Sequence, residues 1–316
     1  MYDGVVTALR DLDFQILERE SVGLVGETGC GKSMLALSVV SLVPHPGRIV
    51  KGSISLKGVE LTKLNREEMR GIRGARISMI FQDPSSSLDP VFTVEHHLSE
   101  IISLHQGIRD ADKLRNSVLE MLRIVKIAAP ETVMKQYPHE LSGGMKQRVM
   151  IAKALCTSPT LIMADEPTTA LDVTIQAQIL QLLKDLVAVR GSSLLLITHN
   201  LGIVAKTCDR VCVMYAGRIV EQAATGEFFE SPKHPYSVGL LNAFPKRGSR
   251  SGELSAIRGT VPNLMHLSPG CAFCERCDRR MDICDSEMPR MVEVARGHFV
   301  ECHLYGSGGE NAHDRT

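Results

Sequence analysis

The octapeptide Gly26-Glu27-Thr28-Gly29-Cys30-Gly31-Lys32-Ser33 follows directly on an apolar run, residues 22–25. It has the pattern G-x-x-x-x-G-K-S of a phosphate-binding loop, in which glycines let successive backbone N–H groups curl around phosphate oxygens. The Lys32 ammonium supplies a positive charge for the β and γ phosphates, and the Ser33 hydroxyl is a ligand for Mg²⁺. We therefore predict that all eight residues bind a nucleoside triphosphate.

The residues that flank this loop predict a strand before it and a helix after it. Residues 22–25 are apolar enough for a buried strand, and residues 33–43 are helix formers and small apolar residues that end at Pro44-His45-Pro46-Gly47. The loop then lies at a helix N-terminus, where the helix dipole favours a phosphate group.

Apolar, β-rich runs recur along the chain and alternate with helical stretches, which predicts an α/β fold. The predicted strands are residues 22–25, 54–56, 77–81, 161–164, 194–198 and 211–215. Between Gln82 and Leu141 the pattern changes, because residues 94–104 and 113–125 carry apolar side chains at three- and four-residue spacings. We expect a helical subdomain to be inserted there. Residues 83–90 are expected to form its flexible joint, and residues 173–190 an amphipathic helix.

Further motifs follow in a fixed order. Residues 141–148 read Leu-Ser-Gly-Gly-Met-Lys-Gln-Arg before a helical stretch, and residues 161–166 form an apolar strand that ends in Asp165 and Glu166. With the phosphate loop, this order resembles the ABC-type ATPases, a family of P-loop NTPases. Residues 141–148 are similar to their signature sequence, residues 161–166 to their Walker B strand and residues 169–172 to their D-loop. Gln82 and His199 match the Q-loop glutamine and the switch histidine.

The resemblance implies ATP hydrolysis, in which positioning and charge neutralisation do most of the catalysis. Asp165, Ser33 and Gln82 would hold Mg²⁺, and Lys32 would contact the phosphates. Glu166 would orient the attacking water, and His199 would contact the γ-phosphate.

The signature residues predict a second phosphate-binding helix N-terminus. Ser142, Gly143 and Gly144 precede a helical stretch, yet the chain already has such a site in its phosphate loop. In ABC ATPases the signature of one subunit closes on the nucleotide of another. The resemblance therefore implies a dimer of two ATPase subunits.

An aromatic residue upstream of the phosphate loop stacks on adenine in this family. Tyr2, 24 residues before Gly26, is the expected residue, with Phe14 as the alternative. Phe14 lies in residues 12–17, whose alternation reads as a strand with a core-facing ring.

Composition limits the classes of function. At 316 residues and 44% hydrophobic, the chain can bury a substantial core. The 36 Lys and Arg balance the 36 Asp and Glu, so nothing in the charge favours a nucleic-acid partner. No apolar run approaches the ~20 residues that span a bilayer. Attachment to a membrane would have to come through another protein.

The last 90 residues narrow the resemblance to a subfamily. Three segments are similar to the C-terminal extension of oligopeptide/dipeptide permease ATPases: residues 234–241, 257–262 and 269–277. This implies an ATPase subunit that energises peptide import at the cytoplasmic face of the inner membrane, with a nickel or other small-solute importer as the alternative. The implied partners are a second, different ATPase subunit, two transmembrane permease subunits and an external solute-binding protein. A soluble, non-transport ABC ATPase is a remote alternative.

These patterns predict three regions. Residues 1–82 and 157–225 form a RecA-like ATP-binding core, residues 83–156 a helical signature subdomain, and residues 226–316 a C-terminal extension with a small cysteine-rich cluster.

Five cysteines crowd into 32 residues of that extension, namely Cys271, Cys274, Cys277, Cys284 and Cys302. A reducing compartment disfavours disulfides, so the cysteines either bind a metal or remain thiols without one. Spacing alone selects the run C-x-x-C-x-x-C at Cys271, Cys274 and Cys277 plus one remote cysteine, and zinc satisfies four thiolates as well as iron does. The resemblance instead implies a 4Fe–4S cluster on Cys271, Cys277, Cys284 and Cys302, with Cys274 as the alternate ligand. A redox-regulated switch is a further possibility.

Overall fold

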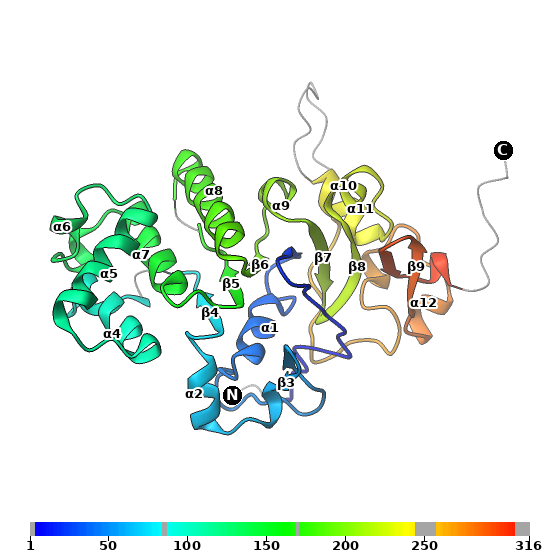
Figure 1. Cartoon of the computed structure of the whole chain (residues 1–316). Helices are drawn as coiled ribbons and strands as arrows, with labels where there is room; N and C mark the ends of the chain where they lie inside the picture. Colours follow the sequence, from blue (N-terminus) through cyan, green and yellow to red (C-terminus); the bar gives the residue numbers. More distant parts are fainter. Residues whose placement is uncertain (1–3, 84–86, 169–170, 244–256, 307–316) are drawn as a thin grey trace. The chain divides into compact units, whose positions relative to one another are not determined.

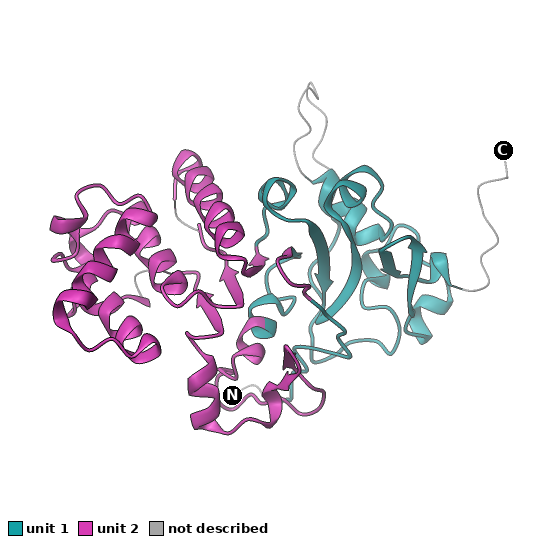
Figure 2. Cartoon of the chain, viewed as in Figure 1, with its two compact units in different colours: residues 1–15, 22–35, 198–316 teal, residues 16–21, 36–197 magenta. Residues whose placement is uncertain are grey.

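The computed structural model describes residues 4–83, 87–168, 171–243 and 257–306 (Figure 1). The chain divides into two compact units, coloured separately in Figure 2. Unit 1 contains Met1–Gln15, Val22–Leu35 and Thr198–Thr316, and unit 2 contains Ile16–Ser21 and Ala36–Ile197.

Unit 1 is built on strands in the order β1-β7-β8-β10-β9. Their bounds are β1 Ser21–Val25, β7 Arg210–Tyr215, β8 Arg218–Ala224, β10 His298–Glu301 and β9 Met291–Ala295. β1 is parallel to β7, and the later pairs are antiparallel. β10 and β9 therefore extend the sheet to which the strand before the phosphate loop belongs.

Short helices accompany these strands in unit 1. They are α9 Leu201–Thr207, α10 Thr225–Glu230, α11 Pro235–Asn242 and α12 Ile283–Ser286, with 3₁₀ turns at Cys274–Arg276 and His303–Tyr305. Side chains cap two of them: Asn200 accepts from the first backbone N–H groups of α9, and the His234 ring accepts from Tyr236 N in α11. These caps fix where α9 and α11 begin.

Unit 2 has three parallel strands in the order β4-β5-β6, at Ile77–Ile80, Leu161–Asp165 and Ser193–Ile197. Their residues are nearly all buried, as expected for a parallel sheet covered on both faces. α8 (Val173–Arg190) joins β5 to β6 and is capped by the Asp172 side chain. α1 (Lys32–Val39) starts in unit 1 and continues into unit 2.

A separate hairpin, β2 (Ser55–Leu56) and β3 (Val59–Glu60), precedes a 3₁₀ turn at Leu61–Lys63 and helix α2 (Arg66–Ile72). A capping box at Asn65 and Glu68 starts α2.

The chain between β4 and β5 is helical in unit 2. It contains α4 Val94–Gln106, α5 Ala111–Ile124, α6 Pro130–Val133, a 3₁₀ turn Pro138–Glu140 and α7 Gly143–Leu155 (Figure 1). α4, α5 and α7 pack against one another through buried apolar side chains such as Leu98, Ile102, Val118 and Leu122. The described residues of 81–160 contain no strand.

Most of the predicted strands are confirmed: β1, β4, β5, β6 and β7 lie where the apolar runs predicted them. Residues 54–56 contain a strand of two residues, but it belongs to the separate hairpin. The predicted strand at residues 12–17 is wrong, because none forms there and Phe14 is half-buried. α1 ends at Val39, before the predicted residue 43. Tyr2, residues 84–86 of the joint and residues 169–170 of the D-loop lie outside the described residues.

Candidate functional site: a phosphate loop and the motifs that accompany it

The phosphate loop has a backbone that requires glycine at two positions. Gly26 has φ 154° and Gly31 has φ 110°, a region that L side chains rarely adopt. A Cβ on Gly26 would lie 2.2 Å from the Met214 carbonyl oxygen, and one on Gly31 would lie 2.8 Å from that of Ala8. The loop is therefore wrapped closely by neighbouring backbone, and only glycine leaves room for it.

Lys32 is buried and folds over this loop as the first residue of α1. Its Nζ donates to the carbonyl oxygens of Gly26 at 2.8 Å and of Glu27 at 2.9 Å. Thr28, Gly29 and Ser33 are exposed, whereas Cys30 is buried, and burial raises the pKa of its thiol. The loop thus offers backbone N–H groups at a helix N-terminus, the Lys32 ammonium over them and the exposed Ser33 hydroxyl beside them. These groups fit a triphosphate with bound Mg²⁺.

His199 lies in the same unit as the loop. Thr198, the residue before it, donates its backbone N–H to the carbonyl oxygen of Leu24 in β1 at 3.2 Å. Because β1 leads into the phosphate loop, this bond places exposed His199 at the carboxyl end of that strand. The loop and the candidate switch histidine are thus brought together within unit 1.

Gln82, Asp165 and Glu166 lie in unit 2, where β4 and β5 are neighbours. Asp165 is buried at the end of β5. Gln82 Nε2 donates to a carboxylate oxygen of Glu166 at 3.1 Å, so the structure brings these two side chains together. Glu166 has φ 45°, which is uncommon for a residue with a Cβ, and its backbone N–H donates to Ile197 O at 2.9 Å. Such backbone geometry is frequent at functional sites.

The signature residues form the start of α7, also in unit 2. Ser142 is the N-cap, and its Oγ accepts from Met145 N at 3.3 Å. A Cβ on Gly143 would lie 3.2 Å from Leu171, and one on Gly144 would lie 3.0 Å from Ile175. The small residues thus let the N-terminus of α7 lie close to the D-loop and α8, while Ser142 and Gly143 stay exposed.

Two residues that sequence reasoning missed contact the phosphate loop. Tyr236 Oη accepts from Glu27 N at 2.8 Å, and the Arg276 guanidinium donates to both carboxylate oxygens of Glu27. Both partners come from more than 200 residues further along the chain. Both lie in segments that carry the resemblance to the C-terminal extension, residues 234–241 and 269–277, but nothing local in those segments indicates a contact with the loop.

The five clustered cysteines are free thiols, as are Cys30, Cys156, Cys208 and Cys212, which are all buried. Nowhere in residues 4–83, 87–168, 171–243 or 257–306 do three or more His, Cys, Asp or Glu side chains form a group that could hold a metal ion. The backbones of two of the cysteines in the extension are paired, because Cys271 N donates to Cys284 O at 2.8 Å. Burial, with a smaller effect of neighbouring thiols, raises the pKa of Cys271 to about 12 and of Cys302 to about 11.

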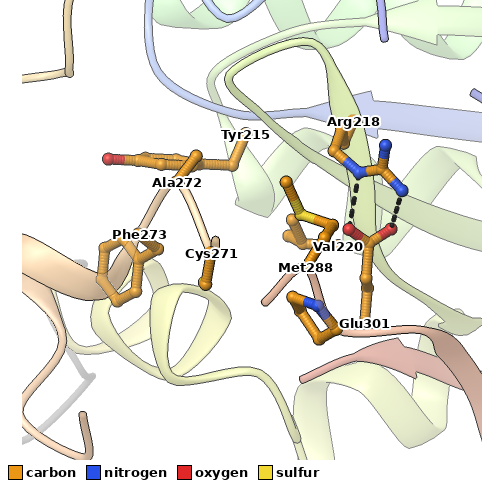
Figure 3. A pocket seen from close by; sticks show the side chains of 9 residues that line it. Tyr215, Arg218, Val220, Cys271, Ala272, Phe273, Met288 and Glu301 are labelled. Atoms are coloured by element: carbon orange, nitrogen blue, oxygen red, sulfur yellow. Dashed lines mark hydrogen bonds and ion pairs between the residues drawn. The ribbon is translucent and has the colours of Figure 1, made fainter. Parts of the chain in front are cut away.

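A small cavity borders this segment within unit 1 (Figure 3). It is lined by Cys271, Phe273, Tyr215 and the ion pair of Arg218 with Glu301, and by neighbouring apolar side chains. Its volume of about 10 Å³ has room for one water molecule, so it cannot be a nucleotide site.

In the part of the chain that the structure describes, no helix is both long enough and apolar enough to span a membrane.

Comparison with known proteins places these motifs in a family. Residues 9–169 match the family described as ABC transporter, and residues 220–284 match the C-terminal region of oligopeptide/dipeptide transporters. A probable peptide ABC transporter ATP-binding protein of Sinorhizobium fredii is 49% identical, over 95% of this chain and 90% of that one. A dipeptide transport ATP-binding protein of Bacillus subtilis is 45% identical, over 98% and 93%. An oligopeptide transport ATP-binding protein of Salmonella typhimurium is 48% identical, over 91% and 85%.

Solved structures agree with this assignment. A dimeric ABC cassette, solved in a post-hydrolysis state with ADP and phosphate, has a TM-score of 0.63 and 28% identity over 71% of this chain and 94% of that one. A component of an ABC transporter complex from Clostridium perfringens has a TM-score of 0.60 and 28% identity, over 71% and 84%. The chain therefore belongs to the ABC transporter ATPases, in the family of the oligopeptide and dipeptide transport ATP-binding proteins.

Proposed function

We propose that this chain hydrolyses ATP to drive an importer of dipeptides or oligopeptides. The observation that carries the proposal is the identity of 45–49% with peptide-transport ATP-binding proteins over at least 91% of the chain. The match at residues 220–284 supports peptides in particular, because it falls outside the ATPase motifs that all ABC proteins share.

Lys32 and Ser33 bind the phosphates and Mg²⁺ of ATP in this proposal, together with the backbone of residues 26–31. The loop's glycine-dependent backbone and the position of Lys32 over it support this role. His199 contacts the γ-phosphate, and its exposed position after Thr198 is compatible with that contact.

Asp165 and Gln82 hold the Mg²⁺ that accompanies ATP, and Glu166 orients the attacking water. Hard oxygen ligands of this kind suit Mg²⁺. The hydrogen bond from Gln82 to Glu166 supports the pairing of a magnesium ligand with the water-orienting carboxylate, since it holds that carboxylate in one position. Hydrolysis needs no covalent intermediate.

Ser142, Gly143 and Gly144 bind the nucleotide of a second ATPase subunit, which we propose to be a different chain. The exposed N-terminus of the 13-residue helix α7 supports this role. ATP then links two subunits, and hydrolysis lets them separate.

Two transmembrane permease subunits and an external solute-binding protein complete the proposed transporter. This subunit would lie at the cytoplasmic face of the membrane. Residues 83–156 form the helical subdomain that meets the permease, between the core regions 1–82 and 157–225, and residues 226–316 form the extension. The helices between β4 and β5 support the helical assignment.

Cys271, Cys277, Cys284 and Cys302 are proposed to hold a 4Fe–4S cluster, with zinc as the alternative metal and Cys274 as the alternate ligand. The crowding of five thiols supports a metal site. The thiols as placed do not fit a metal, since no three of them form a metal-holding group among the described residues, so binding requires them to move together. A structural role suits a segment with little core of its own.

The test separates binding from turnover in the assembled transporter. Lys32→Ala should abolish tight MgATP binding, whereas Glu166→Gln should keep binding and lower turnover at its own site roughly 10²-fold. Normal hydrolysis at the Glu166→Gln site would refute the catalytic assignment.

The transported solute is tested separately. The tagged chain is purified from membranes and its partners are identified by mass spectrometry, and hydrolysis is measured with dipeptides, oligopeptides or nickel. Permease subunits and peptide-stimulated hydrolysis are expected. Stimulation by nickel alone would contradict a peptide importer, and a preparation that holds ribosomes or nucleic acid would contradict a transporter.

A further inference from the structure

The cysteine-rich segment carries an arginine that contacts the phosphate loop directly. Arg276, one residue before Cys277, donates from Nη1 and Nη2 to the two carboxylate oxygens of Glu27, at 2.7 and 2.9 Å. Glu27 is the second residue of the loop, and both residues belong to unit 1. A two-pronged pair of this kind is among the strongest polar contacts, because two parallel bonds fix direction as well as distance.

The Arg276 guanidinium is fixed on its other sides as well. Nε donates to Arg258 O at 2.9 Å, and Nη1 also donates to Tyr215 Oη at 3.3 Å. The cation lies 5.8 Å from the centre of the Tyr215 ring and 5.9 Å from that of Phe273, and only 5% of its side chain is exposed. The hydrogen bonds to Glu27 raise the pKa of Arg276, so the guanidinium stays charged.

Glu27 is held through its backbone too. Its N–H donates to Tyr236 Oη at 2.8 Å, and the buried Tyr236 ring packs against Tyr215 and Phe273. The carbonyl oxygen of Glu27 accepts from Lys32 Nζ at 2.9 Å. A shift of Glu27 would therefore move the ammonium that serves the phosphates.

We propose that Arg276 is a positioning residue for nucleotide binding, which holds and neutralises Glu27 and so couples the cysteine-rich segment to the phosphate loop. The inference rests on the proposed nucleotide site. Without Arg276, Glu27 would be an unpaired carboxylate in a loop that must accept polyanionic phosphate, and like charges at this range repel. Because coupling is reciprocal, nucleotide bound at the loop should in turn stabilise the cysteine-rich segment.

The first test measures MgATP affinity of the full-length chain by isothermal titration calorimetry. Arg276→Gln should raise Kd about tenfold, as expected if the loop adopts its binding conformation about a tenth of the time. Arg280→Gln is the matched control: it lies in the same segment, but it pairs with Asp285, and both side chains are about half exposed. Its Kd should stay within about twofold of the parent, since exposed pairs contribute little.

Unchanged affinity in Arg276→Gln would overturn the proposal, and so would an equal loss in Arg280→Gln, which would indicate general damage to the segment. A double-mutant cycle adds a sharper criterion. Adding Glu27→Gln to Arg276→Gln should weaken binding no further and should recover part of the lost affinity, because it removes the carboxylate that Arg276 no longer neutralises. Fold-changes that multiply would mean that the residues act independently, contrary to the proposal.

Hydrogen exchange tests the reciprocal effect, which a merely structural arginine would not produce. MgATP should slow exchange in the peptide that covers residues 271–284 of the parent chain, and Arg276→Gln should abolish that protection. Absence of protection in the parent would refute the coupling. If the parent chain bound no MgATP, or if Lys32→Ala bound it normally, the nucleotide site itself would be wrong.

Discussion

Glu221 is the residue whose substitution we expect to destabilise unit 1 most clearly. This carboxylate is fully buried on β8 and accepts three hydrogen bonds. Oε1 accepts from Lys233 N at 2.7 Å and faces His298 Nε2 at 2.7 Å, while Oε2 accepts from His234 N at 2.8 Å. The carboxylate thus joins β8, β10 and the start of α11 at one point.

The substitution Glu221→Gln allows the magnitude to be worked out. The amide oxygen can take the place of Oε1 and keep two bonds, but the amide nitrogen then faces the buried N–H of His234. A buried donor is left without an acceptor, and the remaining bonds lose their charge. We expect the free energy of unfolding to fall by about 3 kcal/mol, since a lost charged hydrogen bond contributes about 1.5–3 kcal/mol.

Urea unfolding of the full-length chain, followed by circular dichroism, measures this change. Glu227→Gln is the matched control, because Glu227 contacts the other nitrogen of His298 at 3.0 Å and its side chain is 34% exposed. That variant should lose less than about 1 kcal/mol. A loss below about 0.5 kcal/mol in Glu221→Gln would refute the reasoning, since a change of that size is ordinary for a surface residue.

Three further predictions follow from the site and its surroundings. Gly31→Ala should weaken MgATP binding at least about tenfold, because the alanine Cβ would lie 2.8 Å from the Ala8 carbonyl oxygen at a φ that alanine avoids. Calorimetry measures the affinity, and a value like that of the parent would show that the loop can adapt. Burial lowers the pKa of His234 from 6.5 to about 3, so the unfolded chain binds the extra proton and stability falls as the pH drops from 6.5 toward 3. At about pH 5.5 protonation of this group in the unfolded chain lowers the free energy of unfolding by about 1.4 kcal/mol. His234→Asn, which can still cap α11, should remove this acid sensitivity. Urea unfolding of both proteins at two pH values measures it, and equal acid sensitivity in the two would contradict the prediction. Under anaerobic purification, Cys277→Ser should lose bound iron while Cys274→Ser keeps it. Iron, sulfide and zinc analysis decides, and loss of iron in Cys274→Ser as well would favour the local ferredoxin-like spacing instead.

The sequence alone determined the chemistry of the phosphate loop and the type of several strands and helices elsewhere in the chain. The glycine-rich octapeptide, the buried strands β1, β4, β5, β6 and β7 and the helices between β4 and β5 all have short-range signals. Side-chain periodicity, caps and backbone freedom act over a few residues, so they can be recognised without a fold. The order of the motifs was enough to identify the family.

Only the tertiary structure decided which long-range contacts hold those elements together. The strands β8, β10 and β9 were not predicted, because their pairing depends on partners up to about 80 residues away rather than on a local pattern. Glu27 and Arg276 are 249 residues apart, and Glu221 and His298 are 77 apart. Each of these side chains looks like an ordinary surface charge in the sequence. Only the fold removes them from water and sets their partners, and in a buried environment the pairing of charges then determines their energies.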